Sequence, residues 1–268
     1  MLSRFHTRIL GQTLPALTIT TAMLLLPGQT TAGEWRVGAN LLAAQSPLVG
    51  EDGTVALLPV LAYKGEWFYA NLGNPGISFF TGSSDFGGVG YHLLKGEDFN
   101  IDLVGRIRLM GFDPDDTDEL KGLHEREPGF DAGISARWDI GLGELNALLL
   151  TDISDRSNGQ EVALSYAYPL HQGRWTLRPV VGLSWQSSDL VDYYFGVQSD
   201  ETTISRPTYE GEATFTPFAV IETEYAFSEQ THLVGGLGVG RLGDGISDSP
   251  IIDRRNLAGG YLGLVYRF

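Results

Sequence analysis

The chain contains no cysteine among its 268 residues. This absence excludes a disulfide framework, a thiolate metal site and a cysteine nucleophile. Basic residues are also few, with 18 lysines and arginines against 33 aspartates and glutamates, so the formal net charge is −15. A surface of that sign does not attract nucleic acid phosphate, and we expect no nucleic acid partner.

Long hydrophobic runs are equally scarce. One uncharged apolar run spans residues 14–26, after Arg4 and Arg8 and before the small residues 30–32. This order predicts a secretory signal peptide over residues 1–32, cleaved after Ala32 and exported by the Sec route. An N-terminal anchor helix is the alternative, but the run is shorter than the roughly 20 residues that a spanning helix needs. Residues 33–268 are therefore predicted to form one exported domain.

Catalytic signals are lacking as well. Beyond residue 32 the histidines are His92, His124, His171 and His232, and no Gly-x-Ser-x-Gly sequence occurs. Serine hydrolysis needs a histidine oriented by a third group beside an activated serine, and no such spacing is visible. A membrane hydrolase that uses His92, expected near the outer rim, is a remote alternative. We predict a protein without catalytic residues and without a cofactor.

An acidic stretch resembles a calcium-binding loop in composition only. Residues 113–119 read Asp-Pro-Asp-Asp-Thr-Asp-Glu. They lack the glycine and the terminal glutamate spacing of an EF-hand. We therefore expect no metal site, but a solvated loop that gathers divalent ions near lipopolysaccharide.

The chain does have residues that alternate between two faces with a period of two, and this alternation is clearest in its last segment. Phe268, Tyr266, Leu264 and Leu262 lie on one face of the last segment, and the residues between them lie on the other. This pattern predicts a strand. A closing strand with a terminal aromatic residue, and Tyr266 two positions before it, is typical of bacterial outer-membrane barrels. We therefore expect Tyr266 and Phe268 to form the signal for the barrel-assembly machinery.

Similar alternation recurs along residues 33–268 and predicts about twelve strands. They cover residues 35–43, 55–63, 66–79, 85–94, 100–109, 130–140, 145–153, 161–168, 174–185, 214–227, 233–239 and 257–268. Short turns alternate with longer loops, among them a long loop over residues 187–211. An even strand number with this asymmetry predicts a single all-β, antiparallel transmembrane barrel with short periplasmic turns and longer extracellular loops.

A soluble β-sandwich is the alternative fold, because it too has many alternating strands. The row from Trp175 to Trp185 argues against it, since two tryptophans bracket an apolar face, as at the two interfaces of a membrane. We expect a monomer in the bacterial outer membrane, in contact with outer-membrane lipid and lipopolysaccharide.

The face opposite the apolar rows carries charges of both signs, which a barrel directs into its lumen. The predicted inward residues are Arg36, Asp102, Arg106, Arg108, Asp131, Arg137, Asp139, Glu161, Arg174, Arg178, Glu222, Glu224, His232 and Arg267. They form either a paired network that fills the barrel or a polar ion path. The sequence alone does not distinguish the paired network from the ion path.

The long loops and the last strand carry more specific motifs. They are Asp192-Tyr193-Tyr194-Phe195-Gly196-Val197, Asp248-Ser249-Pro250-Ile251-Ile252, Pro59-Val60-Leu61-Ala62-Tyr63-Lys64-Gly65 and the final Gly-Leu-Val-Tyr-Arg-Phe. In this order they resemble the MipA/OmpV family, the MltA-interacting proteins of Gram-negative outer membranes. The resemblance covers all of residues 33–268. Phe195 departs from it, because the family often has a third tyrosine there.

The resemblance implies a non-enzymatic barrel. The family's namesake is a scaffold for a lytic transglycosylase and a murein synthase in peptidoglycan remodelling, and other members are described as porin-like or as stress and antibiotic-response proteins. For Asp192 and the tyrosines after it we favour a structural role, in which they cap a strand and fold the long loop over the barrel mouth, over ligand recognition. The expected function is that of the scaffold, with a narrow diffusion channel as the alternative.

Overall fold

The computed structural model describes residues 33–73 and 88–268, which belong to one compact unit, Gly33–Phe268. The predicted signal peptide over residues 1–32 lies outside the described residues. So does the part between 74 and 87 of the two strands predicted over 66–79 and 85–94.

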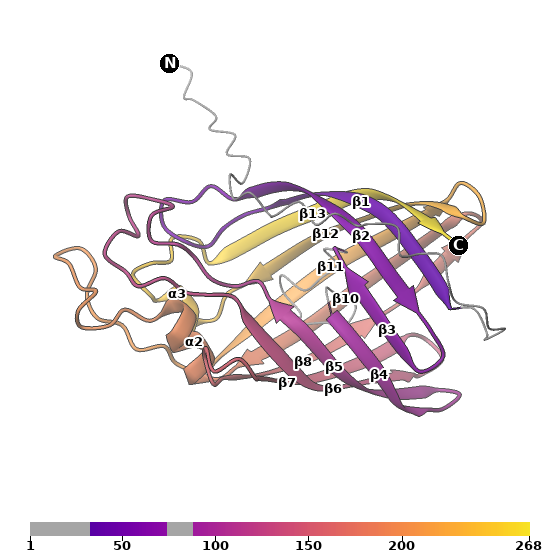
Figure 1. Ribbon diagram of the computed structural model, residues 1–268, viewed down its shortest axis with the longest axis horizontal. Helices are drawn as coiled ribbons and strands as arrows, with labels where there is room; N and C mark the ends of the chain where they lie inside the picture. The colour runs from indigo at the N-terminus through magenta and orange to yellow at the C-terminus, as the bar shows by residue number, and fades with distance from the viewer. Residues whose placement is uncertain (1–32, 74–87) are drawn as a thin grey trace, which may run out of the picture. The chain divides into compact units, whose positions relative to one another are not determined.

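Antiparallel strands make up most of the described chain (Figure 1). They are β1 (Glu34–Ala44), β2 (Thr54–Lys64), β3 (Phe68–Leu72), β4 (Gly88–Lys95), β5 (Phe99–Arg108), β6 (Gly129–Asp139), β7 (Glu144–Asp152), β8 (Gln160–Ala167), β9 (Leu170–Gln172), β10 (Trp175–Gln186), β11 (Thr214–Ala226), β12 (Thr231–Arg241) and β13 (Asn256–Arg267). β8 and β9 pair with successive parts of β10 and are separated by residues 168–169. The thirteen segments therefore form twelve barrel strands.

The sheet closes on itself. Each barrel strand pairs with the next along the chain, and β1 pairs with β13 from Arg36 opposite Arg267 to Ala44 opposite Gly259. Closure leaves neither of these strands as a free edge, so the backbone groups of both are satisfied within a membrane. The predicted antiparallel barrel of about twelve strands is confirmed.

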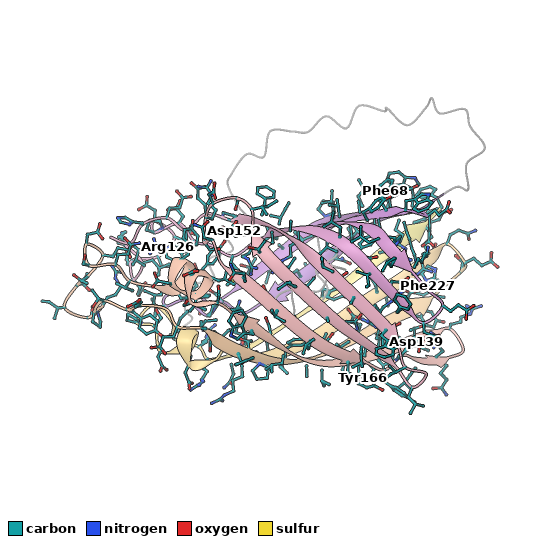
Figure 2. All side chains as sticks on the ribbon, turned by 90° about the horizontal axis from the view of Figure 1, so that it is seen from below. Phe68, Arg126, Asp139, Asp152, Tyr166 and Phe227 are labelled. Atoms are coloured by element: carbon teal, nitrogen blue, oxygen red, sulfur yellow. The ribbon has the colours of Figure 1, made fainter. Side chains whose placement is uncertain are left out.

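The two ends of the barrel differ. At one, which we call the turn end, β1 begins, β13 ends, and residues 65–67, 96–98 and 140–143 make short turns. At the other, the loop end, residues 45–53, 109–128, 187–213 and 242–255 form longer connections. Phe68, Asp139 and Phe227 mark the turn end in Figure 2, whereas Arg126 lies at the loop end.

Outward rows are apolar and exposed. On β13, Leu262 and Leu264 are 56% and 52% exposed, whereas the inward Val265 is 7% exposed. Aromatic pairs gather near the turn end, where the rings of Trp35 and Tyr63 lie 4.8 Å apart. A belt of this kind is typical of a membrane interface. None of the helices in the described part of the chain is long and apolar enough to cross a bilayer.

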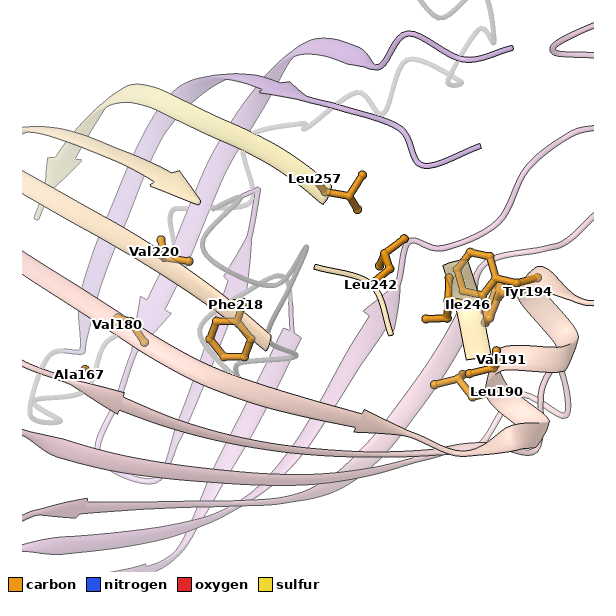
Figure 3. Close-up of a cluster of buried hydrophobic side chains, with 11 residues drawn as sticks. Ala167, Val180, Leu190, Val191, Tyr194, Phe218, Val220, Leu242, Ile246 and Leu257 are labelled. Carbon is orange, nitrogen blue, oxygen red and sulfur yellow. The ribbon is translucent and has the colours of Figure 1, made fainter. Parts of the chain in front are cut away.

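The loop end carries a packed cap. Its residues 187–211, expected as a loop, contain the helix α2 (Ser188–Phe195), which begins where the Ser187 side chain accepts a hydrogen bond from the Leu190 N–H. A second short helix, α3 (Asp244–Ser247), lies in the last loop. The α2 residues Leu190, Val191 and Tyr194 are buried in one apolar cluster with α3 and the inward face of the barrel wall (Figure 3).

Four loops contribute to a second apolar cluster in the cap. Its buried members are Leu48, Phe112, Leu120, Leu123, Val197 and Ile251. Isolated β-bridges join Leu48 to Ile252, Phe112 to Arg126 and Val197 to Tyr209. The loops therefore have a core of their own rather than lying separately in solvent.

Candidate functional site: the barrel interior

Many side chains that point into the barrel are buried, and they come from most of its wall. They come from nine of the barrel strands and are each at most 7% exposed: Asn40, Val60, Val104, Asp131, Leu150, Glu161, Val180, Ser184, Phe218, Val220 and Val265. The interior side chains of a water-filled channel would be accessible to solvent. The barrel interior is therefore packed around these side chains.

Four charged side chains lie together within this packed interior. This central cluster consists of Arg106 and Arg108 on β5, Asp131 on β6 and Glu161 on β8. Arg106 lies 3.0 Å from the Asp131 carboxylate and 2.5 Å from that of Glu161, and Arg108 lies 2.7 Å and 2.8 Å from the same two carboxylates. Each guanidinium therefore contacts both acids, and the cluster is neutral. Ser184 on β10 donates a further hydrogen bond of 3.0 Å to Glu161.

The described residues line two separate interior cavities. One, of about 280 Å³, lies at the loop end between Arg106, Arg108 and the cap residues Tyr194 and Ile246. The other, of about 350 Å³, lies in the turn-end half and is bounded by Leu148 and Ala163. Leu148 and Ala163 pack with Val104 in an apolar group next to the central cluster. Packed apolar and ionic side chains thus separate the two cavities.

His92 points into the turn-end cavity, not to the outer rim where the sequence suggested it. Its Nδ1 lies 2.7 Å from Asp102, and the Tyr69 hydroxyl donates to the other oxygen of that carboxylate at 3.3 Å. The Nε2 atom of His92 is buried, and no hydrogen bond joins it to a serine within the described residues. Among the described residues, this histidine is oriented by a carboxylate but has no serine beside it to activate.

Two further inward arginines of the turn-end half, Arg178 and Arg267, are paired. Arg178 lies 2.7 Å from Glu222 and 3.1 Å from Glu144. Arg267 lies 2.7 Å from Glu224, and His232 approaches the same carboxylate at 2.7 Å.

Two residues of the predicted inward set lie elsewhere. Arg174 is exposed in the turn before β10, where it donates to the Phe227 carbonyl oxygen, so its expected position in the lumen is wrong. Asp139 ends β6 and accepts a hydrogen bond from the Gly141 N–H in the turn that follows. In both places the chain leaves the sheet, and the alternation of faces ends with it.

The cap has an ionic hub that the sequence analysis missed. The fully buried Glu201 carboxylate accepts hydrogen bonds from Arg126 at 2.9 and 3.0 Å and from the backbone N–H groups of His124 and Gln198 at 2.6 and 2.8 Å. Burial alone would raise the pKa of Glu201, but the two N–H groups and the Arg126 guanidinium hold it below its usual value. The Arg206 guanidinium donates to the Glu201 carbonyl oxygen and to that of Lys121. The hub therefore joins the loop 109–128 to the loop 187–213.

The motif residues lie within the cap. The expectation that Asp192 caps a strand is wrong, because it lies in α2 and accepts a hydrogen bond of 2.8 Å from the Gly211 N–H. Tyr193 and Tyr194 contact the backbone N–H and carbonyl oxygen of Glu127 through their hydroxyl groups.

The remaining motif residues end the two short helices. Gly196 follows the last residue of α2, and its N–H donates to the Asp192 carbonyl oxygen. Asp248 ends α3, the buried Ser249 hydroxyl donates to the Phe195 carbonyl oxygen at 2.6 Å, and Pro250 follows it. These residues connect the last loop to α2.

Metal ligands do not gather in the described residues. Within residues 33–73 and 88–268, no three His, Cys, Asp or Glu side chains are grouped so as to hold a metal ion. In the acidic stretch, Asp113 accepts a hydrogen bond from the Asp115 N–H, and Asp118 pairs with Lys121.

Sequence comparison gives the family. The model of the MltA-interacting protein MipA matches residues 37–268. The chain belongs to the MipA family. This MipA-family protein is 27% identical to the putative outer membrane protein YiaT of Escherichia coli K12, over 92% of this chain and 97% of the relative.

Two further relatives agree. Outer membrane protein OmpV of Vibrio cholerae is 26% identical, over 85% of this chain and 84% of the relative, and the MltA-interacting protein of Escherichia coli K12 is 26% identical, over 88% and 91%. YiaT and OmpV are named as outer membrane proteins, and none of these three relatives is named as an enzyme. The MipA-family protein described here is an outer-membrane barrel.

Proposed function

We propose that this protein is a closed, non-enzymatic barrel that serves as an outer-membrane scaffold for murein-remodelling enzymes. The observation that carries the proposal is the burial of the inward side chains, with the central cluster among them. A barrel packed in this way does not offer solutes an aqueous path. Without transport through its lumen, the barrel acts by presenting its surfaces to partner proteins.

The identity of the partner rests on relatives. One of them is named MltA-interacting protein, and the matching family model carries the same description. We extend that interaction to this chain and place the partner, a lytic transglycosylase together with a murein synthase, at the turn end. In outer-membrane barrels the short turns face the periplasm, where murein lies.

A narrow channel is the second candidate. Its support is the pair of interior cavities, which lie along the same lumen on either side of the central cluster. Conduction would require the Arg106 and Arg108 side chains to leave Asp131 and Glu161. Leaving one member of a buried ion pair without its partner costs about 3–5 kcal/mol, so the closed arrangement dominates in the absence of a force or a ligand that opens it.

Single-channel recording in a planar bilayer distinguishes the two candidates. We expect the refolded protein, residues 33–268, to be silent. Stable conductance steps that change in Arg106→Ala, but not in Arg241→Ala, would contradict the closed barrel and establish the channel. Arg241 is the matched control because it is exposed at the loop end, where it contacts Asn256.

The scaffold needs its own test. Immobilised protein, folded in detergent, should retain the purified lytic transglycosylase and murein synthase of the same organism at micromolar concentrations. A protein without the barrel's turn-end surface, such as the same chain left unfolded, is the control. Absence of retention for both enzymes would refute the scaffold even if the barrel is silent in bilayers.

A further inference from the structure

The turn-end cavity carries an excess of positive charge in a protein that is otherwise acidic. Five cationic side chains line this cavity of about 350 Å³: Arg36, Lys64, Lys95, Arg137 and Arg178. Two carboxylates, Glu34 and Asp102, also line it. The formal net charge of the whole chain is −15, so this interior surface differs in sign from the protein as a whole.

Some of these charges are already compensated. Arg36 lies 2.6 Å from Glu34, and Asp102 is engaged by His92 and Tyr69. Arg178 is held by Glu222 from the neighbouring strand β11 and by Glu144 from β7, which lies beyond β8. These contacts engage both carboxylates of the cavity wall, and the charge of Lys64 also acts on Glu34 from a longer distance.

Three cations remain. In the described ranges 33–73 and 88–268, no carboxylate lies within 4.0 Å of Lys64, Lys95 or Arg137. They come from β2, β4 and β6, and all three are exposed to solvent. The Asn100 amide oxygen, turned toward Arg137, accepts a hydrogen bond of 3.1 Å from its guanidinium. Asn100 therefore orients the Arg137 side chain while leaving its charge uncompensated.

We propose that this cavity binds a small solute that bears a carboxylate or phosphate group, with Arg137 as its anchor and Lys64 and Lys95 as supporting charges. A guanidinium presents a planar pair of donors that matches either oxyanion. A recess with walls of low dielectric constant concentrates the field of its charges, which raises the local concentration of anions. The volume suits a ligand of metabolite size.

The site does not depend on the closed lumen or on a murein partner, because it opens toward the turn end. With that end in the periplasm, the solute reaches it without crossing the central cluster. If the scaffold function or the closed barrel were refuted, the proposed anion site would still stand. If the anion site were refuted, the scaffold function and the closed barrel would still stand.

Calorimetric titration of the folded protein in non-ionic detergent at low ionic strength tests the proposal. Inorganic phosphate and succinate are the probes, and erythritol is the uncharged control. We expect saturable binding of at least one anion and none of erythritol. Arg137→Gln should weaken binding by about tenfold to a hundredfold, because a charge-assisted hydrogen bond is lost. Phosphate and succinate together show which oxyanion the site prefers.

The matched control is Arg174→Gln, since Arg174 is an exposed arginine of the turn end that does not line the cavity. It should leave the affinity unchanged. The double change Lys64→Gln with Lys95→Gln provides a second test in case Arg137→Gln does not fold, as judged by heat-modifiable migration. No saturable binding by the parent protein, or equal losses in Arg137→Gln and Arg174→Gln, would overturn the proposal and leave these cations as solvated surface charges.

Discussion

Replacing Glu201 by glutamine should open the cap while leaving the barrel folded. The carboxylate accepts four hydrogen bonds of 2.6–3.0 Å, two of them from Arg126, which is only 4% exposed. Glutamine keeps the shape but removes the charge and turns an NH₂ donor toward other donors. Removing one partner of a buried ion pair costs about 3–5 kcal/mol, and we expect this loss in the local stability of the cap.

Hydrogen exchange of the cap amides measures that loss. A change of 3–5 kcal/mol corresponds to exchange that is about 200 to 5,000 times faster, at Val197, Gln198 and Tyr209. Amides of β5 and β6 should be unaffected, because the barrel is held by its own ladder. Asp200→Asn is the matched control, since Asp200 is exposed and lies 3.3 Å from the exposed His124, a contact worth at most about 1 kcal/mol. If exchange in Glu201→Gln rises by no more than in Asp200→Asn, the Glu201 hub does not hold the loops together.

Two further predictions concern the cap and the assembly of the barrel. Because the folded-state pKa of Glu201 lies below its ordinary value of 4.5, its contribution is fully present above that pH and is lost as the pH falls through the lower folded pKa. Cap exchange, corrected for intrinsic rates, should therefore accelerate below pH 4.5 in the parent protein, and this acceleration should be absent in Glu201→Gln; an equal acceleration in both would assign it to another group. Deletion of Phe268, which packs on Tyr266 with ring centroids 4.9 Å apart, should reduce heat-modifiable insertion in cells, and normal insertion would remove the role of the terminal strand as the assembly signal.

Period-two alternation predicted the barrel because burial in a barrel wall has the same period. One face meets lipid and the other the interior, so Leu262 and Val265 could be assigned to opposite faces from position alone. The same rule failed for Arg174, because alternation can be counted past the point where a strand ends. Strand ends depend on hydrogen bonds to a neighbouring strand, which spacing along one segment does not show.

The sequence does contain a signal for helix α2, although period-two alternation does not detect it. Leu190, Val191, Tyr194 and Phe195 have the spacing of a helical face, and Ser187 is a favourable N-cap. The ionic contacts had no such signal. Arg126 and Glu201 are 75 residues apart, and the pairing of Arg106 with Glu161 depends on how β5 to β8 align. Sequence could therefore place charges on the inward face, but it could not say which of them neutralise one another.

The pairing of β1 with β13 has a kinetic consequence. Every other pairing between the described barrel strands joins neighbours in sequence, so it can form as a local hairpin at little entropic cost. Only the pairing of β1 with β13 brings together strands from the two ends of the barrel sequence. It requires the whole intervening segment to be ordered first. Until β1 pairs with β13, the incomplete sheet has two edge strands with unpaired backbone groups, and a strand of another barrel can pair with either of them. Folding of this protein should therefore be slowest, and most prone to hybrid or mispaired products, at its final step.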